Sequence, residues 1–414
     1  MSEVKDNYFQ CITIGNHISE LPKSKLPASA AFENGRYPFI CSSSELRYTN
    51  SYLETKPAVI MGTGGVASVH FGKEQFAYST DTWAIRSKSY QLDTEFLYRK
   101  IQHLLPDIDF RAFEGSGLKH LKKNDVKKLK IGVPLDSNVS KKLLKILRTI
   151  DQTIEKTEAL IAKYQLIKAG LMQDLFTRGI EADGKLRPTR EQAPELYHET
   201  KIGWIPKDWV CDEIKNFVTS AQYGVSISLS DEENGIPVLR MNNIKNNKFD
   251  VSDLKYSNSV EASTIKIREG DVLYNRTNSM EHVGKTAIWR NELSECSFAS
   301  YLVRMNLKVD ILLPDFFSHW MSQDSSQIAL RRYATPAVQQ VNINPTNVQK
   351  VLIACPKEIA EQQIIFERID AIDLKIFAEE DMLLKLEKQK QGLMHDLLTG
   401  KKRVTVDECE AEHV

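Results

Sequence analysis

The chain carries one helical phrase twice, and this duplication limits the folds that it can adopt. KAGLMQDLFTRG at residues 168–179 returns as KQGLMHDLLTGK at residues 390–401, with seven of the twelve positions identical. The same offset aligns VKKLKIGVP (126–134) with VQKVLIACP (348–356). A looser match at a slightly shorter offset pairs CITI (11–14) with CDEI (211–214), and GRYPFICSSSEL (35–46) with GIPVLRMNNI (235–244) if one residue is skipped. We therefore predict that a globular domain followed by a long helix occurs twice.

Both copies of the long helix carry a continuous apolar seam. Alternate steps of four and three residues meet an apolar side chain at eight of ten positions in each copy, which is typical of a coiled coil. The polar breaks fall at equivalent places, Thr157 with Glu379 and Lys168 with Lys390. These polar side chains either fix the register of the helix pair or lie where the seam reaches solvent. The predicted seam residues are Leu143, Leu147, Ile150, Ile154, Ile161, Leu171, Leu175, Ile365, Ile369, Ile372, Ile376, Leu383, Leu386, Leu393 and Leu397.

The predicted fold class is α+β, with two β-rich domains joined by two long antiparallel helices and an internal pseudo-two-fold repeat. Short β-branched or aromatic runs bounded by turn residues predict strands at AVIM (58–61), VASVHF (66–71), DVLYN (271–275), YLVRMNL (301–307) and KVLIAC (350–355). We expect a first domain at 1–134, a helix at 135–179, a surface linker at 180–204, a second domain at 205–356, a second helix at 357–400 and a tail at 401–414.

Composition excludes several classes of protein. The six cysteines form no C-x-x-C pair and lie far from any histidine cluster, so we expect reduced thiols, with neither a disulfide framework nor a zinc site. There is no run of eighteen apolar residues, so we expect no membrane span. The polar start MSEVKDNYFQ lacks the apolar core of a signal peptide.

Motifs of stand-alone enzymes fit poorly. GTGGVA (62–67) matches a loose dinucleotide-binding pattern, but the strand-like VASVHF that follows is not the helix which that motif requires. GKT (284–286) ends like a phosphate-binding loop, but Ser279 stands where the first glycine belongs. We find no hydrolase, zinc-protease, kinase or amino-methyltransferase motif, and NPT (344–346) falls short of the last. We therefore expect no catalytic residues and no metal site.

Several phrases together resemble the specificity subunits of Type I restriction-modification systems, over nearly the whole chain. The most specific is KQKQGLMHDLLTGKKRV (388–404), with its echo at 168–179. IGWIPKDW (202–209) resembles the start of a target-recognition domain in that family, although the first domain starts differently, with NYFQCITIG. FAYSTDTWAI (76–85) and VLYNRTNSMEHVGKTAIW (272–289) resemble phrases of two target-recognition subfamilies.

The resemblance implies a non-catalytic cytoplasmic subunit that reads a bipartite sequence in double-stranded DNA. Each target-recognition domain then reads one half-site, and the paired helices set the spacing and dock two copies of a methyltransferase subunit, which restriction subunits join. No cofactor is expected in this chain, and S-adenosylmethionine is expected on the methyltransferase. Because the two domains differ in sequence, the DNA site is expected to be asymmetric.

Candidate DNA-reading residues are donors and acceptors near turns, with cations for phosphates. Turn formation and structural hydrogen bonding are the alternative roles for the Asn and Ser residues, and a solvated face is the alternative for the lysine run. In the first domain the candidates are Thr63, Gly64, Gly65, Ser68, Lys73, Ser79, Thr80, Lys119, Lys122 and Lys123, with Lys127 and Lys128 in the same lysine run. In the second domain they are Arg240, Asn242, Asn243, Asn275, Arg276, Thr277, Asn278, Lys285, Gln339, Gln340 and Asn342.

Charge and the repeated phrase add two further expectations. Residues 15–134 carry 17 Lys/Arg and 12 Asp/Glu, a net of +5, whereas residues 205–356 carry 16 and 17, a net of −1. The second domain alone is therefore expected to bind DNA poorly. Partner docking is assigned to Gly170, Met172, Asp174, Gly392, Met394 and Asp396. Two alternatives remain open at this point: an enzyme with an unusual active site, and a coiled-coil DNA-binding scaffold or regulator without modification partners.

Overall fold

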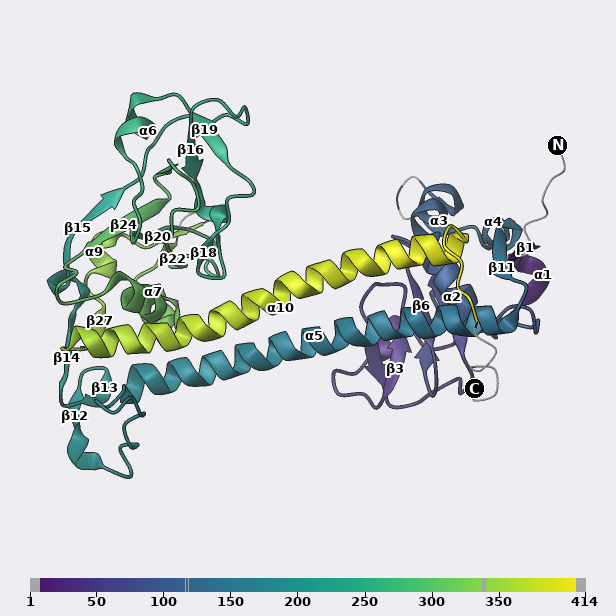
Figure 1. Ribbon diagram of the computed structural model, residues 1–414, viewed down its shortest axis with the longest axis horizontal. Coiled ribbons are helices and arrows are strands. Elements are labelled where there is room, and N and C mark those ends of the chain that lie inside the picture. The colour runs from purple at the N-terminus through teal and green to yellow at the C-terminus, as the bar shows by residue number, and fades with distance from the viewer. Residues whose placement is uncertain (1–7, 116, 118, 337–339, 407–414) are drawn as a thin grey trace. The chain divides into compact units, whose positions relative to one another are not determined.

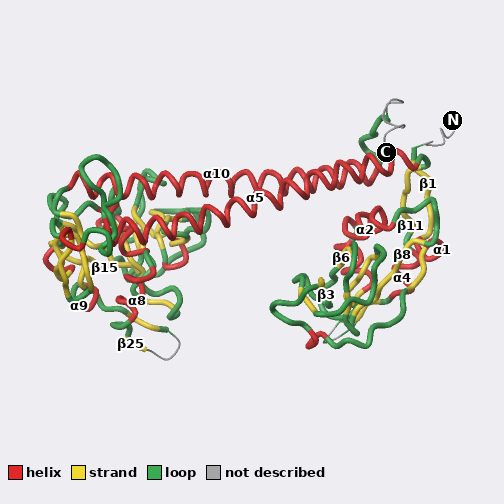
Figure 2. The backbone as a smooth tube through the Cα atoms, turned by 90° about the horizontal axis from the view of Figure 1, so that it is seen from below, coloured by secondary structure: helices red, strands yellow, loops and turns green. Residues whose placement is uncertain are grey.

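The computed structural model describes residues 8–115, 117, 119–336 and 340–406. The chain divides into two compact units, one of residues 1–159 with 380–414 and one of residues 160–379. Two long helices, α5 (Ser137–Arg178) and α10 (Ile359–Thr399), contribute a segment to each unit. Within each unit these segments lie side by side and run antiparallel (Figures 1 and 2). The predicted helix pair is thus present, and none of the fifteen predicted seam side chains is exposed.

The first unit places a small β-rich domain beside the start of α5 and the end of α10. Its strands are β1 (Phe9–Thr13), β2 (Ile18–Glu20), β3 (Tyr37–Ile40), β4 (Arg47–Thr49), β5 (Ala58–Gly62), β6 (Val69–Gly72), β7 (Ala77–Tyr78), β8 (Thr82–Ser87), β9 (Phe113–Glu114), β10 (His120–Leu121) and β11 (Lys130–Pro134). Its short helices are α1 (Ile14–His17), η1 (Ala28–Ala30), α2 (Thr94–His103), α3 (Leu105–Ala112) and α4 (Lys123–Lys128).

The second unit contains the corresponding domain with more elements. Its strands are β12 (Tyr197–Thr200), β13 (Gly203–Pro206), β14 (Trp209–Glu213), β15 (Val218–Tyr223), β16 (Ile236–Leu239), β17 (Ile244–Lys245), β18 (Lys248–Phe249), β19 (Lys255–Ser257), β20 (Val272–Asn275), β21 (Thr277–Asn278), β22 (Thr286–Ile288), β23 (Ser297–Phe298), β24 (Leu302–Leu307), β25 (Thr335–Pro336), β26 (Val341–Asn342) and β27 (Leu352–Pro356). Its short helices are η2 (Pro194–Leu196), η3 (Ile214–Asn216), η4 (Met241–Asn243), α6 (Val260–Thr264), α7 (Pro314–Ser322), α8 (Asp324–Arg331) and α9 (Pro345–Val348).

Sheet topology shows that the two domains are copies of one fold. The four-stranded sheets have the orders β2-β8-β5-β6 and β15-β24-β20-β22, and the three-stranded sheets β4-β3-β7 and β19-β16-β23 match in the same way. Strand register gives the offsets, because Phe9 pairs with Pro134 and Trp209 pairs with Pro356. Phe9 and Trp209 are thus equivalent at the shorter offset, and Pro134 and Pro356 at the longer one, as the sequence matches predict.

Each domain core is completed by helix ends from both copies of the repeat. In the first unit Leu143 and Leu147 of α5 and Leu397 and Leu398 of α10 join the core that α2 and the four-stranded sheet form. In the second unit Leu175, Phe176, Ile365 and Ile369 do the same beside α7. At about 1.5–3 kcal/mol for each fully buried side chain, these residues bind the helices tightly to the domains.

The helices end where glycine permits a left-handed backbone. α5 is followed by Gly179 with φ +65°, and α10 by Gly400 with φ +77°. This is the usual way in which an α-helix stops, because glycine adopts that conformation without a Cβ clash. Both glycines lie at the end of the repeated phrase, so the duplicated sequence encodes the last turns of a helix and its stop.

Two predictions about local structure were wrong. The stretch 180–204 is not a plain surface linker, because it contains β12 and part of the β12–β13 hairpin and buries Ile180, Arg187 and Tyr197. Arg187 pairs with Glu361 and Asp208, and Glu361 also accepts a bond from the Trp209 indole (3.1 Å). VASVHF is a strand only from Val69 onward, since the preceding residues form a turn.

The described helices include no candidate membrane span. Not one of them is both long and apolar enough to cross a membrane. The longest two, α5 and α10, carry charged side chains throughout their length.

Candidate nucleic-acid interface

The predicted DNA-reading residues of the two domains meet at one topologically equivalent turn. In the first domain β5 ends at Gly62, and we call the segment Gly62–Gly65 the first turn. In the second domain β20 ends at Asn275 at the same sheet position, and we call the segment Asn275–Asn278, which includes the two-residue strand β21, the second turn. The Leu121 amide donates to the Thr63 carbonyl (3.0 Å), and the Ile343 amide donates to the Arg276 carbonyl (2.8 Å). Since positions 121 and 343 are equivalent in the repeat, both turns are held by the same repeated strand.

Side chains around the first turn hold its backbone in place. The Ser42 hydroxyl donates to the Gly64 carbonyl at 2.9 Å, and the Thr63 hydroxyl donates to the Asp81 carbonyl at 2.7 Å. The Gly65 amide donates to the Lys119 carbonyl at 3.0 Å. The structure thus brings Thr63, Gly64, Gly65 and Lys119 together, and only the lysine adds charge.

The second turn carries larger polar side chains. The Arg276 guanidinium lies over the Tyr223 ring at 5.1 Å and donates to the Asn342 side chain at 3.3 Å. Asn342 also accepts a hydrogen bond from Thr277. Asn278 is half-buried and accepts from the Ser279 amide at 2.8 Å. Arg276, Thr277 and Asn342 therefore form one polar group, with Asn278 next to it in sequence. The exposed Gln340 lies close to Asn342 in sequence, while Gln339 lies outside the described residues.

Some predicted base readers are structural instead. Ser79 is fully buried and donates to Asp81. Asn243 is buried, donates to the carbonyls of Asp250 and Asp253 (2.8 Å each) and accepts from the Arg240 amide, so it closes the loop between β16 and β19. Direct base contact by Ser79 and Asn243 is therefore contradicted, because their polar atoms are used inside the domain.

Other predicted readers have mixed environments. Asn275 and Thr277 are buried, and the Asn275 amide reaches the Met241 carbonyl at 3.4 Å. Arg240 and Asn242 both donate to Asp253, at 2.9 and 3.1 Å. Since these four side chains have partners within the domain, base contact would require them to change partners. The remaining positions divide by exposure: Lys73 is exposed, Thr80 and Lys285 are half-buried, and Ser68 is buried with a hydroxyl that has no partner in the described structure.

The predicted lysine run divides between two places. Lys119 lies at the first turn, whereas Lys123, Lys127 and Lys128 lie on α4. Lys122 pairs with Glu114, Lys127 pairs with Glu20, and Lys128 lies 3.5 Å from Asp125. Lys123 lies over the Trp83 ring at 5.8 Å. The run is therefore not one phosphate-binding face, and Lys119 is the lysine that the structure places beside the first turn.

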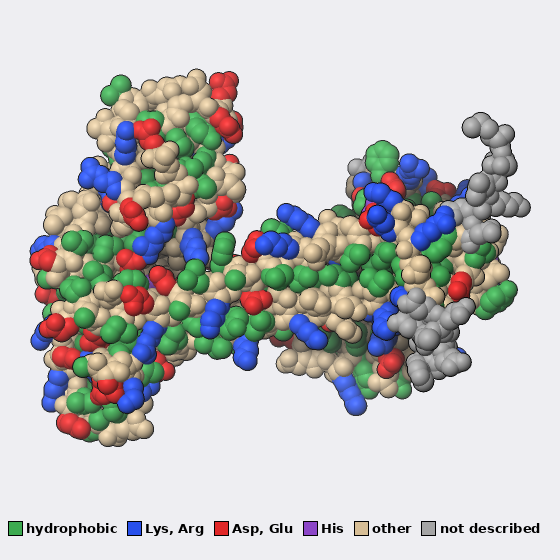
Figure 3. All heavy atoms as spheres, viewed as in Figure 1, with side chains coloured by type: hydrophobic (Ala, Val, Ile, Leu, Met, Phe, Trp, Pro, Cys, Tyr) green, Lys and Arg blue, Asp and Glu red, His purple; other side chains and the backbone are tan. Residues whose placement is uncertain are grey.

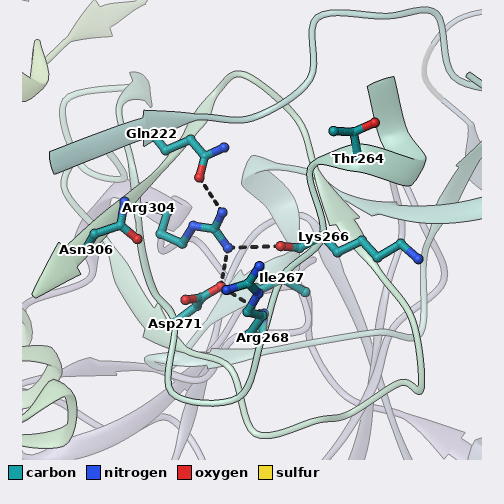
Figure 4. Close-up of a pocket in the computed structure, with 8 residues that line it drawn as sticks. All are labelled: Gln222, Thr264, Lys266, Ile267, Arg268, Asp271, Arg304 and Asn306. Carbon is teal, nitrogen blue, oxygen red and sulfur yellow. Dashed lines mark hydrogen bonds and ion pairs between the residues drawn. The ribbon is translucent and has the colours of Figure 1, made fainter. Parts of the chain in front are cut away.

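A polar pocket lies in the second domain. Arg304 is buried beneath this pocket, which has a volume of about 520 Å³ and is shown in Figure 4. Its guanidinium donates to Asp271, Gln222 and the Lys266 carbonyl. At the equivalent position the first domain has Ala84, packed with Phe76 and other apolar side chains. The two domains thus have the same sheet topology, but different side chains pack against the sheet.

The coiled coil contains two equivalent ion pairs. Lys390 lies 2.7 Å from Asp151, and Lys168 lies 2.6 Å from Asp373. The two lysines occupy equivalent positions of the repeat, and so do the two aspartates. This is the reciprocal pattern of contacts that a two-fold interface produces. The lysines that interrupt the seam therefore bond across the helix pair, which supports the register-fixing alternative for them; Thr157 is buried and bonds to the Thr153 carbonyl at 3.0 Å.

The predicted docking residues form three pairs, of which one is buried, one is exposed and one is half-buried. Met172 and Met394 are only 8% and 7% exposed and lie in the domain cores, so docking by their side chains is contradicted. Gly170 and Gly392 are exposed, and a Cβ added at either would meet no atom within 4 Å. The third pair is half-buried: Asp174 pairs with Arg178 at 3.0 Å and Asp396 with Lys401 at 3.5 Å. The methionines recur because they pack, whereas packing within the chain does not explain the glycines.

Sequence comparison identifies the repeat. The family described as Type I restriction modification DNA specificity domain matches residues 17–164 and again residues 206–388. The chain belongs to this family. A Type I restriction enzyme MjaVIII specificity subunit from Methanocaldococcus jannaschii is 23% identical over 96% of this chain and 93% of its own length. A putative MjaX specificity subunit from the same organism is 26% identical over 50% of this chain and about half (49%) of its own length.

Solved specificity-family structures share the fold. The Type I S subunit from M. genitalium superposes with a TM-score of 0.62 at 12% identity, covering 98% of this chain and 99% of the other. A chain from a structure that describes complex assembly and conformational transition of the type I R-M system gives a TM-score of 0.52 at 15% identity, covering 95% and 98%. The two-domain, two-helix architecture is therefore that of the specificity family.

Several residues that contact the two turns were not predicted from the sequence. Ser42 supports the first turn, His120 lies opposite Gly64, and Tyr223 lies under Arg276. His120 could have been found, because the offset of the repeated helical phrase places it on Asn342. Ser42 and Tyr223 come from distant segments and carry no local signal.

Proposed function

We propose that this chain is the sequence-reading subunit of a Type I restriction-modification complex and is not itself an enzyme. Each domain reads one half of an asymmetric bipartite site in double-stranded DNA. The observation that carries this proposal is that one fold presents two different sets of side chains at the same turn. The first turn offers Thr63 and two glycines, whereas the second offers Arg276 and Asn278. Identical frames with different readers favour two different half-sites.

The helices support a second part of the proposal, which concerns partners. Two copies of a methyltransferase subunit dock on the exposed surface around Gly170 and Gly392, and restriction subunits join that assembly in the cytoplasm. A glycine inside an exposed helix costs about 1 kcal/mol relative to alanine. Both copies of the repeat have glycine at this position, as expected if a partner backbone approaches closely there. S-adenosylmethionine belongs to the methyltransferase.

The length of the helices supports a third part of the proposal, which concerns the spacing of the half-sites. We propose that helix length sets the unread gap between half-sites, as subunit geometry sets half-site spacing in symmetric DNA-binding proteins. Inserting one heptad into both seams should then lengthen the gap.

Because residues 205–356 carry a net charge of −1, useful affinity for DNA depends on the methyltransferase partners. Nanomolar specific binding by the isolated chain at physiological salt would contradict this dependence.

Methylome sequencing of the host with and without this gene tests the proposal directly. Loss of one asymmetric bipartite methylation motif is the expected result, and it also names the DNA target. An unchanged methylome would favour the alternative of a coiled-coil DNA-binding scaffold without modification partners. Methyl transfer by the purified chain alone would instead show an enzyme.

A further inference from the structure

Large apolar side chains project into solvent beside the first turn. Val66 follows Gly65 directly and is 79% exposed, and Phe110 on α3 is 86% exposed. The Ala67 amide donates to the Asp109 carboxylate at 2.9 Å, so the residues that flank this bond, Val66 and Phe110, come from adjoining backbone. Figure 3 shows a hydrophobic side chain standing out over α3, with blue side chains beside it.

The loop after the second turn also exposes an apolar side chain, as does the helix beside it, although not at the residues equivalent to Val66 and Phe110. Met280 lies two residues after Asn278 and is 49% exposed, and Ile328 on α8 is 54% exposed. The Gln327 side chain donates to the Gly284 carbonyl (2.9 Å), and the Arg331 guanidinium donates to the Glu281 carbonyl (3.2 Å). These bonds hold the loop after the second turn against α8, as the Asp109 bond holds the first loop against α3.

Recurrence distinguishes these side chains from scattered surface residues. Single exposed apolar residues are normal and need no explanation. Here, however, both copies of the fold expose one just after the turn and one on the helix to which the following loop bonds, at positions that differ by a few residues between the copies. Packing within the chain does not explain these apolar side chains, because they lie in solvent. A function that both domains share would explain them.

The surrounding charge indicates which partner covers them. Arg111 and Lys119 are exposed beside the first pair, and both Arg332 and Glu281 are exposed beside the second, so the excess of cations is clearest in the first domain. Asp109, the acidic neighbour of Phe110 in sequence, already accepts a backbone bond. A polyanion fits these cations better than a protein surface does. Among DNA base edges the apolar group available in the major groove is the thymine C5-methyl, which apolar side chains contact.

Resting on the proposed function, we propose that Val66 and Phe110 in the first domain, and Met280 and Ile328 in the second, read thymine C5-methyl groups, one pair in each half-site. Apolar contact at these positions complements the polar contacts of Thr63 in one domain and Arg276 and Asn278 in the other. The site read by each domain therefore includes a thymine on one strand at the position that faces α3 or α8.

The test uses the complete complex of this chain with its methyltransferase and the DNA target found by methylome sequencing. Each thymine of the half-sites is replaced in turn by deoxyuridine, which removes only the methyl group, and affinity is measured by competition. For wild type we expect one replacement per half-site to weaken binding about fourfold, the effect of one buried methyl at about 0.8 kcal/mol. In Phe110→Ala the replacement in one half-site should have no further effect, and in Ile328→Ala the same should hold in the other.

Controls separate this inference from the function on which it rests. Tyr90→Ala removes another exposed aromatic side chain of the first domain and should leave the deoxyuridine effect intact. The inference is overturned if Phe110→Ala and Ile328→Ala bind like wild type, if they weaken binding equally for thymine and deoxyuridine, or if they lose the methyltransferase on purification. A wild-type complex that does not prefer the methylated motif would instead refute the proposed function.

Discussion

The two units use the same frame but distribute their charges differently. Both contain the aspartate–lysine pair of the coiled coil, Asp151 with Lys390 and Asp373 with Lys168. Around that pair the first unit adds Arg99, which pairs with Asp151, whereas the second adds His319, which lies 2.8 Å from Asp370. The contacts between the helices are thus repeated, while those from each domain to the helices are not. The helix pair preserves its register, and each domain attaches to it in its own way.

The largest expected effect comes from a network that only the second unit has. Glu361 pairs with the buried Arg187, whereas the equivalent position in the first unit is the buried Val139. Glu361→Ala removes the buried partner of Arg187 and leaves it only the more exposed Asp208, so we expect a loss of about 3 kcal/mol in the free energy of unfolding by urea. Val139→Ala, the matched control, should cost about 1–2 kcal/mol.

A double variant sharpens this first prediction. Arg187→Met with Glu361→Leu replaces the ion pair by apolar side chains and should recover most of the stability lost in Glu361→Ala. If the double variant is no more stable than Glu361→Ala, the loss does not come from an unpaired buried charge.

The next effect depends on pH and belongs to the first unit. Burial lowers the pKa of Lys100 to about 8, and its ammonium donates to the Leu398 carbonyl at the end of α10. Helix α7 has a run of buried residues like that of α2, and its residue at the position of Lys100 is the uncharged Trp320. Between pH 8 and 10.5 the unfolded chain binds this proton more tightly than the folded one, so stability rises with pH, by up to about 3 kcal/mol.

Comparison with Lys100→Met isolates that contribution. The difference in free energy of unfolding between wild type and the variant should increase from pH 8 to pH 10.5 and stay constant from pH 6 to 7. A difference that does not vary with pH across the alkaline range would show that Lys100 titrates normally in the folded chain.

A smaller effect should be equal in both units. Gly170→Ala and Gly392→Ala each fill open space on a helix and should raise the free energy of unfolding by about 1 kcal/mol. Both substitutions should also weaken co-purification of the methyltransferase, because a methyl group then occupies the approach of the partner. Stabilisation without loss of the methyltransferase would remove the glycines from the docking surface.

The smallest effect tests the equivalence of the coiled-coil ion pairs. Double-mutant cycles with alanine at Asp151 and Lys390, and at Asp373 and Lys168, should give similar coupling energies of about 0.5–1 kcal/mol, since all four side chains are half-buried. Coupling in only one pair would show that the register is fixed from one end of the helix pair.

The sequence was sufficient for features that depend on periodicity and failed where distant segments meet. Seam positions and offsets were predictable because a heptad and a duplicated phrase are local patterns. Ser79 and Asn243 looked like base readers because their side chains can bond to DNA or to the backbone, and only the fold decides between these. Arg187 looked like a linker residue because its partner Glu361 is 174 residues away. Met172 looked exposed because its role in the core requires the second domain to be present.

The division of the chain also affects the order of folding. The second unit is one continuous segment, residues 160–379, whereas the core of the first, built mainly from residues before 160, is completed by side chains between residues 393 and 406. On a ribosome the N-terminal domain must therefore wait for Leu397 and Leu398, whose docking closes a loop that contains the whole second unit, at an entropic cost. We expect the second domain to gain amide protection first during refolding, although it is made later.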